Sequence, residues 1–268
     1  MQAVEPALAL EHISVTFISE GAARYTAIKD ATLVVRPGEF VSVVGPTGCG
    51  KSTLLNVAAG LLAPSAGAVR LSGVPLAGLN RKAGYLFQTE ALLPWRTARD
   101  NVTAGLEFRG VEEGEAKQRA EHWLQRVGLR GHGHRYPHQL SGGMRKRVAL
   151  AQTFINNPQV LLMDEPFSSL DVQTRELMQE ELLQLWAQAK SAVLFVTHDL
   201  DEAILLADRV AVLTTRPARV KSVHTIDLPR PRDVAEIRMT PRFIELHTRI
   251  WQTMKDEVLK GYEQQKNQ

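Results

Sequence analysis

Apolar positions along the chain predict strands that alternate with helices. Short, mostly apolar runs at 40–44, 160–164, 192–197 and, more weakly, 210–213 are typical of strands buried on both faces. Helical patterns cover 53–59, 115–127, 145–154 and 172–188. Because strands and helices that alternate along a chain form a mostly parallel sheet covered by helices, the pattern predicts an α/β fold.

Two segments depart from this alternation. Residues 97–156 contain no strand-like run, which indicates a helical lobe inserted between strands of the sheet. Beyond Pro229 an amphipathic helix is predicted, because apolar residues recur every three or four positions at Phe243, Leu246, Ile250, Met254 and Val258. We therefore expect one domain over residues 1–229, with its sheet core at 1–88 and 157–229 and a helical subdomain at about 89–156, followed by a helical extension at 230–268.

The composition is that of an ordinary globular protein. Of 268 residues, 44% are hydrophobic and 23% are charged, which excludes a disordered chain and a collagen-like fibre. A formal net charge of +3 is too small for an obligate nucleic-acid binder, so we expect no nucleic-acid partner. The basic excess lies from Arg216 onward, where a solvated helix face is the simplest interpretation and contact with anionic lipid or a partner is the alternative.

The pattern of cysteines, histidines and apolar runs excludes several kinds of site. Cys49 is the one cysteine, which rules out an internal disulfide and a multi-cysteine zinc site and fits a reducing compartment. His132, His134 and His138 are close in sequence, but the glycines between them indicate a flexible loop rather than a metal site. We find no signal-peptide pattern and no apolar run of the roughly 20 residues that span a bilayer, so a membrane role requires a partner.

A phosphate-binding motif follows the first buried strand. Residues 45–52 match the pattern G-x-x-x-x-G-K-[ST], with a strand before them and a helical stretch after them. The glycines allow successive backbone N–H groups to point at an anion, and the helix N-terminus adds partial positive charge. In this pattern Lys51 reaches the β- and γ-phosphates of a nucleotide and the Ser52 hydroxyl binds Mg²⁺. Cys49 is expected to be only a small residue of the loop.

Two adjacent carboxylates end the second buried strand. The apolar run at 160–163 leads into Asp164 and Glu165, and burying these charges beside phosphates is costly unless a cation is present. Because successive strand residues point in opposite directions, we expect Asp164 to hold Mg²⁺ through water while Glu165 faces the attacking water. Together with the phosphate-binding motif, this pair predicts a nucleotide-hydrolysing site.

A second glycine turn opens a later helix. Ser141 is a favourable N-cap, and Gly142 and Gly143 permit an oxyanion to approach backbone N–H groups closely. A capped helix start is enough to explain this turn by itself. The chain already has one full phosphate cradle, so the alternative is that this turn completes the site of a second copy in a C₂ dimer. Asp171 would then lie at the shared seam.

Taken in chain order, these residues resemble the ATPases of ATP-binding cassette (ABC) transporters. The resemblance rests on residues 45–53, 88, 140–144, 164–165, 169–171 and 198, and it covers residues 8–225. The five-residue motif at 140–144 is specific to that family among P-loop proteins. The resemblance implies a P-loop NTPase fold with a mostly parallel core sheet, an antiparallel β portion and an inserted helical subdomain.

The resemblance also implies the site residues. Nucleotide contacts would come from Gly45, Pro46, Thr47, Gly48, Cys49, Gly50, Lys51, Ser52 and Thr53 and, on the second copy, from Ser141, Gly142, Gly143 and Asp171. The catalytic residues would be Glu165, His198 at the γ-phosphate and Gln88 beside the attacking water. Ser52, Gln88 and Asp164 would hold Mg²⁺. For the aromatic residue that stacks on adenine, Phe17 fits the family spacing and Tyr25 is the alternative.

One departure from the family pattern follows the glycine turn. Lys146 and Gln152 stand where glutamine and arginine are frequent in the family. Both lie beyond the turn that faces phosphate, so the sequence predicts no loss of activity from either.

The resemblance extends to partners and substrate. It implies an ATP-dependent head-to-tail dimer, taken as a homodimer, bound to integral-membrane permease subunits at the cytoplasmic face of the inner (plasma) membrane. Residues 91–95 and 228–232 are similar to those of the nitrate, sulfonate and taurine importer group, which implies uptake of a small anion and an indirect periplasmic solute-binding partner. Leu92, Leu93 and Trp95 would either belong to the core or line a groove for a permease helix.

Two other function classes fit less of the sequence. A soluble, non-transport ABC ATPase acting on DNA or ribosomes usually carries long coiled-coil insertions or tandem cassettes, and this chain has neither. A small-molecule kinase of the P-loop class leaves residues 140–144 and Asp171 without a role. We therefore expect an ATPase subunit of a small-anion importer, with ATP and Mg²⁺ in its site.

Overall fold

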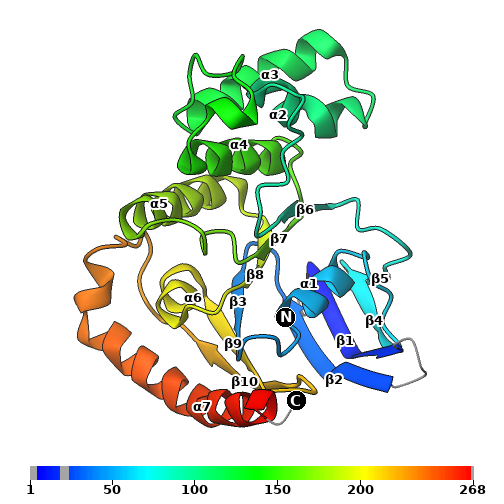
Figure 1. The fold of residues 1–268 in the computed structure, drawn as a ribbon, viewed down its shortest axis with the longest axis vertical. Helices are drawn as coiled ribbons and strands as arrows, with labels where there is room; N and C mark the ends of the chain where they lie inside the picture. The colour runs from blue at the N-terminus through cyan, green and yellow to red at the C-terminus, as the bar shows by residue number, and fades with distance from the viewer. Residues whose placement is uncertain (1–4, 19–23, 267–268) are drawn as a thin grey trace.

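Two sheets and several helices make up the structure, a computed structural model that describes residues 5–18 and 24–266 (Figure 1). The larger sheet has six strands in the order β10-β9-β3-β8-β7-β6, and neighbouring strands run parallel except β9 and β10. These strands are β3 (Phe40–Val44), β6 (Ala83–Leu86), β7 (Val160–Asp164), β8 (Ala192–Val196), β9 (Arg209–Leu213) and β10 (Val220–Thr225). This sheet confirms the predicted mostly parallel core.

The apolar runs predicted the central strands of this sheet and missed two others. Every residue of β3 and β8 is buried, as expected for strands that are covered on both faces. Strand β6 has only four residues, two of them half-buried, and β10 alternates between half-buried and exposed positions at the sheet edge. Neither strand therefore contains the continuous apolar run by which the others were recognised.

A smaller antiparallel sheet lies beside the core sheet, with the strand order β2-β1-β4-β5. Its strands are β1 (Leu8–Ile18), β2 (Arg24–Val35), β4 (Ala66–Leu71) and β5 (Val74–Pro75). Helix α1 (Lys51–Ala58) contacts strands of both sheets. Its buried Leu54 and Leu55 belong to the same apolar cluster as Val41 and Val43 of β3. The antiparallel β portion implied by the family resemblance is therefore present.

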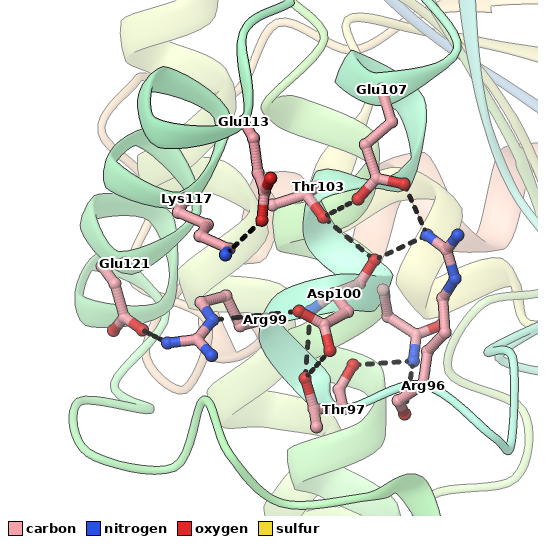
Figure 2. A network of polar contacts seen from close by, with 10 residues as sticks. Arg96, Thr97, Arg99, Asp100, Thr103, Glu107, Glu113, Lys117 and Glu121 are labelled. Carbon is pink, nitrogen blue, oxygen red and sulfur yellow. Dashed lines mark hydrogen bonds and ion pairs between the residues drawn. The ribbon is translucent and has the colours of Figure 1, made fainter.

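Three helices stand together at the top of Figure 1, within the segment predicted to be helical. They are α2 (Ala98–Glu107), α3 (Glu113–Arg126) and α4 (Gly142–Phe154). Figure 2 shows polar contacts in and around α2 and α3: Arg96 Nη1, just before α2, donates to Glu107 Oε2 of α2 at 2.8 Å, and Arg99 of α2 pairs with Glu121 of α3 at 3.4 Å. Because these side chains are partly exposed, the pairs add little free energy, and buried apolar residues hold the three helices together.

The remaining helices flank the core sheet. They are α5 (Val172–Ala189), α6 (Leu200–Leu206) and α7 (Pro241–Lys266), with short 3₁₀ helices at Pro137–Gln139 and Ile237–Met239. Helix α7 packs on α6 and β9. The predicted apolar positions of α7 face this contact: four are buried and one is partly buried, namely Phe243, Leu246, Ile250, Met254 and Val258. The C-terminal amphipathic helix is thus confirmed, whereas the exact domain division stays a prediction.

In the described part of the chain, no helix combines the length and the apolar character that a bilayer crossing requires.

Candidate active site

The predicted phosphate loop connects β3 to α1. Its Gly48 and Gly50 have φ angles of 71° and 121°, which glycine adopts without the steric cost that other residues incur. A side chain at Gly50 would also place its Cβ 3.3 Å from the Ala27 carbonyl oxygen. Helix α1 then begins at Lys51 with no side-chain cap, so its first backbone N–H groups are available to an anion. The local geometry is that of a phosphate cradle.

Lys51 lies across this loop. Its Nζ donates to the carbonyl oxygens of Gly45 at 2.9 Å and Pro46 at 3.1 Å, and the residue is only 6% exposed. The loop forms one wall of a cavity of about 410 Å³. The lining residues are Tyr25, Thr47, Gly48, Gly50, Lys51, Ser52, Thr53, Gln88, Glu165 and Arg216. The structure thus gathers most of the predicted loop residues together with Gln88 and Glu165 at one cavity.

Ser52 and Asp164 meet at the end of β7. The Ser52 hydroxyl donates to Asp164 Oδ1 at 3.0 Å. Burial raises the pKa of Asp164, although the hydrogen bond from Ser52 opposes that shift. A hydroxyl and a carboxylate are the oxygen ligands that Mg²⁺ prefers, and a cation here would offset the cost of a buried carboxylate. These two residues therefore fit the predicted Mg²⁺ site.

Tyr85 is a neighbour of Asp164 that the sequence analysis did not identify. Its hydroxyl donates to Asn56 Oδ1 at 3.0 Å, and the Asp164 carboxylate lies close to the same hydroxyl. Burial, together with the negative charge of Asp164, raises the pKa of Tyr85. The tyrosine therefore stays neutral beside this carboxylate. Tyr85 lies on β6, which pairs with β7, and nothing in the local sequence indicates that it lies beside Asp164.

Glu165 and His198 are in direct contact. His198 Nδ1 lies 2.9 Å from Glu165 Oε2, and the Glu165 backbone N–H donates to the Val196 carbonyl oxygen at 2.8 Å. Because β7 and β8 are parallel neighbours, the residues that follow their carboxyl ends emerge at the same edge of the sheet. Glu165 has a φ of 42°, in the left-handed region, which turns its backbone out of the strand direction. The carboxylate and the imidazole thus form one hydrogen-bonded pair beside the phosphate loop.

Gln88 is tied to helix α4 through Lys146. Lys146 is 1% exposed, and its Nζ donates to the Gln88 carbonyl oxygen at 2.7 Å. Burial lowers the pKa of Lys146. The residues around Lys146 in the sequence do not indicate that it contacts Gln88, so no role was predicted for it. The contact links the helix that starts at the glycine turn to a residue of the cavity.

Ser141 and Asp171 both act as helix caps. Ser141 Oγ accepts from the Met144 backbone N–H at 3.3 Å at the start of α4, and Asp171 Oδ1 accepts from the Thr174 backbone N–H at 2.9 Å at the start of α5. The latter bond lowers the pKa of Asp171. Within the described ranges, the residues that line the phosphate-loop cavity do not include Ser141, Gly142, Gly143 or Asp171. Their role in the site of a second copy stays a prediction.

Phe17 and Tyr25 face each other across β1 and β2. They are paired in the strand register, and their rings stack with centroids 6.5 Å apart and an interplanar angle of 16°. Tyr25 lines the phosphate-loop cavity, and the Arg216 guanidinium lies 5.1 Å from its ring centroid. Phe17 is not among the residues that line this cavity in the described part of the chain. The geometry favours Tyr25 over Phe17 for stacking on a base; residues 19–23 between them lie outside the described residues.

Cys49 is buried in the phosphate loop, and His138 packs on a neighbouring aromatic ring. Cys49 is 1% exposed, and burial raises the pKa of its thiol, so it stays protonated. Among residues 5–18 and 24–266, no three His, Cys, Asp or Glu side chains are grouped in a way that would hold a metal ion. The nearby His138 stacks on Tyr136.

Comparisons with known proteins identify the family of this chain. A model of the ABC transporter family matches residues 28–168. An uncharacterised ABC transporter ATP-binding protein of Methanocaldococcus jannaschii, MJ0412, is 48% identical over 238 residues, covering 89% of this chain and 88% of that protein. The nitrate import ATP-binding protein NrtD of Synechococcus elongatus is 44% identical over 227 residues, covering 84% and 83%. The taurine import ATP-binding protein TauB of Pelagibacter ubique is 40% identical over 240 residues, covering 87% and 90%.

A solved structure has the same fold. It is the dimeric post-hydrolysis state of the ATP-binding cassette MJ0796 bound to ADP and Pi. The TM-score is 0.73 at 31% sequence identity, and the match covers 83% of this chain and 100% of that one. Both the family model and the relatives cover the phosphate loop, and the relatives and the solved structure extend over most of the chain. The chain therefore belongs to the ABC transporter family.

Proposed function

We propose that this chain is the ATP-hydrolysing subunit of an ABC importer for a small anion, and that it works as a dimer around two ATP molecules with Mg²⁺. One observation carries the proposal: the phosphate loop, Glu165 and Gln88 line one cavity, and His198 is bonded to Glu165. Among the described residues, the Ser141 turn is not part of that lining, so it would bind the ATP held by a second copy. Membership of a transporter family disfavours a soluble, non-transport ATPase.

The residues of this chain divide the work of hydrolysis. Lys51 and the first N–H groups of α1 bind and orient the phosphates. Glu165 orients the attacking water and takes its proton while the bond between the γ-phosphorus and the ADP oxygen breaks; His198 hydrogen-bonds to the same carboxylate and contacts the γ-phosphate. Ser52 and Asp164, with Gln88 beside them, would hold Mg²⁺. When bound, this ion would neutralise negative charge on the phosphates. Tyr25 stacks on the adenine.

Two copies would complete each site head to tail. The Ser141–Gly143 turn of one copy begins helix α4, whose N-terminal N–H groups suit a γ-phosphate held by the loop of the other copy. Exposed Asp171 caps the neighbouring helix α5 and would lie at the seam between copies. The cassette MJ0796, 31% identical to this chain, is dimeric, which supports a working dimer.

Mixing two inactive variants tests this arrangement. Ser141→Arg blocks the glycine turn but keeps Lys51, whereas Lys51→Met removes the ammonium but keeps the turn. Each variant alone should be inactive, and an equimolar mixture should recover about a quarter of the wild-type ATPase rate, because half of the random dimers contain one intact site. A mixture no more active than its separate components would contradict the head-to-tail site. Circular dichroism of each variant checks that it is folded.

A groove beside the cavity supports docking to a permease. A cavity of about 370 Å³ lies between β6, α2 and α4, and it is lined by apolar Leu93 and Phe108 together with charged Glu90 and Arg109. Phe108 is 87% exposed and Trp95 is 71% exposed. Exposed aromatic side chains beside a mixed groove suit a short amphipathic helix. We propose that this groove receives such a helix from the integral-membrane permease, which holds the chain at the cytoplasmic face of the membrane.

Relatives that import nitrate and taurine support a small anion as the solute. Cells that lack this chain should lose uptake of one solute among nitrate, taurine and aliphatic sulfonates, and the plasmid-borne chain should restore it. The measurement is uptake of each radiolabelled solute. A periplasmic solute-binding protein is the expected indirect partner. Unchanged uptake of all three, together with a chain that fractionates away from membranes, would favour the soluble ATPase instead.

A further inference from the structure

The last turns of helix α7 lie against the phosphate loop. A Cβ at Gly261 would be 3.3 Å from Pro46 Cβ and 3.3 Å from Thr215 Oγ1, so the helix packs at this point with no side chain between it and the loop. In Figure 1, α7 (red) runs along the bottom of the core and ends near β10. Its buried Phe243 and Leu246 fix the other end of the helix on the core. The position of Gly261 is therefore set by the whole helix.

Pro46 matters because it holds Lys51. The Pro46 carbonyl oxygen is one of the two acceptors of the Lys51 Nζ, at 3.1 Å. A shift of Pro46 away from α7 would move that acceptor and change where the ammonium lies in the phosphate loop. The contact at Gly261 thus bears on the cation that binds the nucleotide phosphates.

Glu257, one turn before Gly261, makes a second connection. It is 5% exposed; its Oε2 accepts from the Thr215 backbone N–H at 3.0 Å and its Oε1 accepts from Lys221 Nζ at 2.9 Å. Burial would raise the pKa of Glu257, but the hydrogen bonds from Lys221 and Thr215 bring it below its usual value. The carboxylate is therefore charged at neutral pH and fixes the segment that follows β9.

That segment leads directly to the phosphate loop. The residue after Thr215 is Arg216, whose Nε donates to the Gly48 carbonyl oxygen. Arg216 also lines the phosphate-loop cavity beside Tyr25. Glu257 thus reaches the loop through Thr215 and Arg216, while Gly261 reaches it through Pro46. The C-terminal helix therefore meets the phosphate loop directly at Pro46 and indirectly through Thr215 and Arg216.

We propose that helix α7 supports the phosphate loop, and that Glu257 and Gly261 are positioning residues that set the affinity for ATP without touching it. This inference rests on the proposed ATP site and adds that helix α7 sets the affinity of that site for ATP. The sequence interpretation of this helix as a solvated basic face does not account for these contacts. Displacing the end of α7 would weaken ATP binding while leaving Glu165 and His198 in place.

Gly261→Ala separates this role from stability. Alanine is the better helix former by about 1 kcal/mol, which offsets the crowding at Pro46 and Thr215, so the midpoint of thermal unfolding should stay close to that of the wild-type chain. The added methyl group presses on Pro46 and Thr215, so the KM for ATP should rise at least about threefold while kcat stays within about twofold. A merely structural residue would show the reverse, a changed midpoint with an unchanged KM.

Glu257 variants give a graded series in the full-length chain. Glu257→Ala removes both hydrogen bonds, whereas Glu257→Gln keeps an acceptor for the Thr215 N–H and loses the charge facing Lys221. The dissociation constant of a fluorescent ATP analogue should therefore increase from wild type to Gln to Ala, by about tenfold in total. Asp256→Ala, which changes the adjacent exposed carboxylate, should bind the analogue as wild type does.

The outcomes distinguish this inference from the proposed function. Failure of the wild-type chain to bind the analogue would overturn the ATP site itself. Normal binding by wild type, Gly261→Ala and Glu257→Gln alike would overturn the role of α7 and leave the ATP site intact. Should Glu257→Ala fail to fold, Gly261→Ala still decides the question.

Discussion

Glu165→Gln is expected to bind ATP and to form the ATP-dependent dimer while hydrolysing ATP at least about a hundredfold more slowly than the wild-type chain. Glutamine has nearly the shape of glutamate, so the left-handed backbone at residue 165 and the phosphate loop should be undisturbed. An amide cannot take the proton of the attacking water, and it replaces the charged partner of His198. The loss should therefore fall on kcat. Phosphate release measures turnover, and size-exclusion chromatography with ATP measures the dimer.

Glu236→Gln is the matched control, because Glu236 is exposed and lies in the linker before α7. It should keep the wild-type rate and dimerise only transiently, since it still hydrolyses ATP. Near-normal ATPase activity in Glu165→Gln would refute the assignment of the base. Loss of ATP binding in the same variant would mean instead that Glu165 organises the cavity.

Lys51→Met should lose most of its affinity for ATP. Methionine keeps the length of the buried stem but has no ammonium, and hydrogen bonds to charged groups contribute about 1.5–3 kcal/mol, which is roughly a 10- to 100-fold change in the dissociation constant. Folding should be unharmed or improved, because a buried ammonium is costly and Lys51 is 6% exposed. Titration with a fluorescent ATP analogue and thermal unfolding measure the two effects.

Lys82→Met provides the comparison for this loss. Lys82 is exposed at the start of β6, so removing its charge should change neither affinity nor stability by more than a small amount. Wild-type affinity in Lys51→Met would show that the backbone N–H groups of α1 alone bind the phosphates. A lower midpoint of unfolding would show that the lysine is needed for the loop itself.

Local patterns were sufficient for the parts of the molecule in which neighbours in sequence are also neighbours in space. Strands β3, β7 and β8 are mostly apolar because they are covered on both faces, and the 45–52 motif needs only the strand before it and the helix after it. The spacing of apolar residues in α7 reflects a single buried face. Each of these features is encoded within about twenty consecutive residues, so it is visible without a structure.

Contacts between distant segments were not visible in the same way. Lys146 meets the Gln88 carbonyl, 58 residues away in sequence. Within the described residues Tyr25 lines the cavity and Phe17 does not, although the two are partners in the strand register. Their spacing from the phosphate loop could not distinguish them. The sequence around Lys146 and around Tyr25 does not indicate which distant residues each of them contacts.

The sequence by itself determined the chemistry of this protein: a phosphate loop, a carboxylate pair after a buried strand and a glycine turn suited to a second copy. Tertiary structure decided which side chains control that chemistry, since Glu257 and Gly261 reach the loop only after α7 has packed across α6 and β9. The physical reason is that a motif fixes backbone geometry over a few residues. The orientation and charge state of its side chains depend on whatever the rest of the chain brings against them.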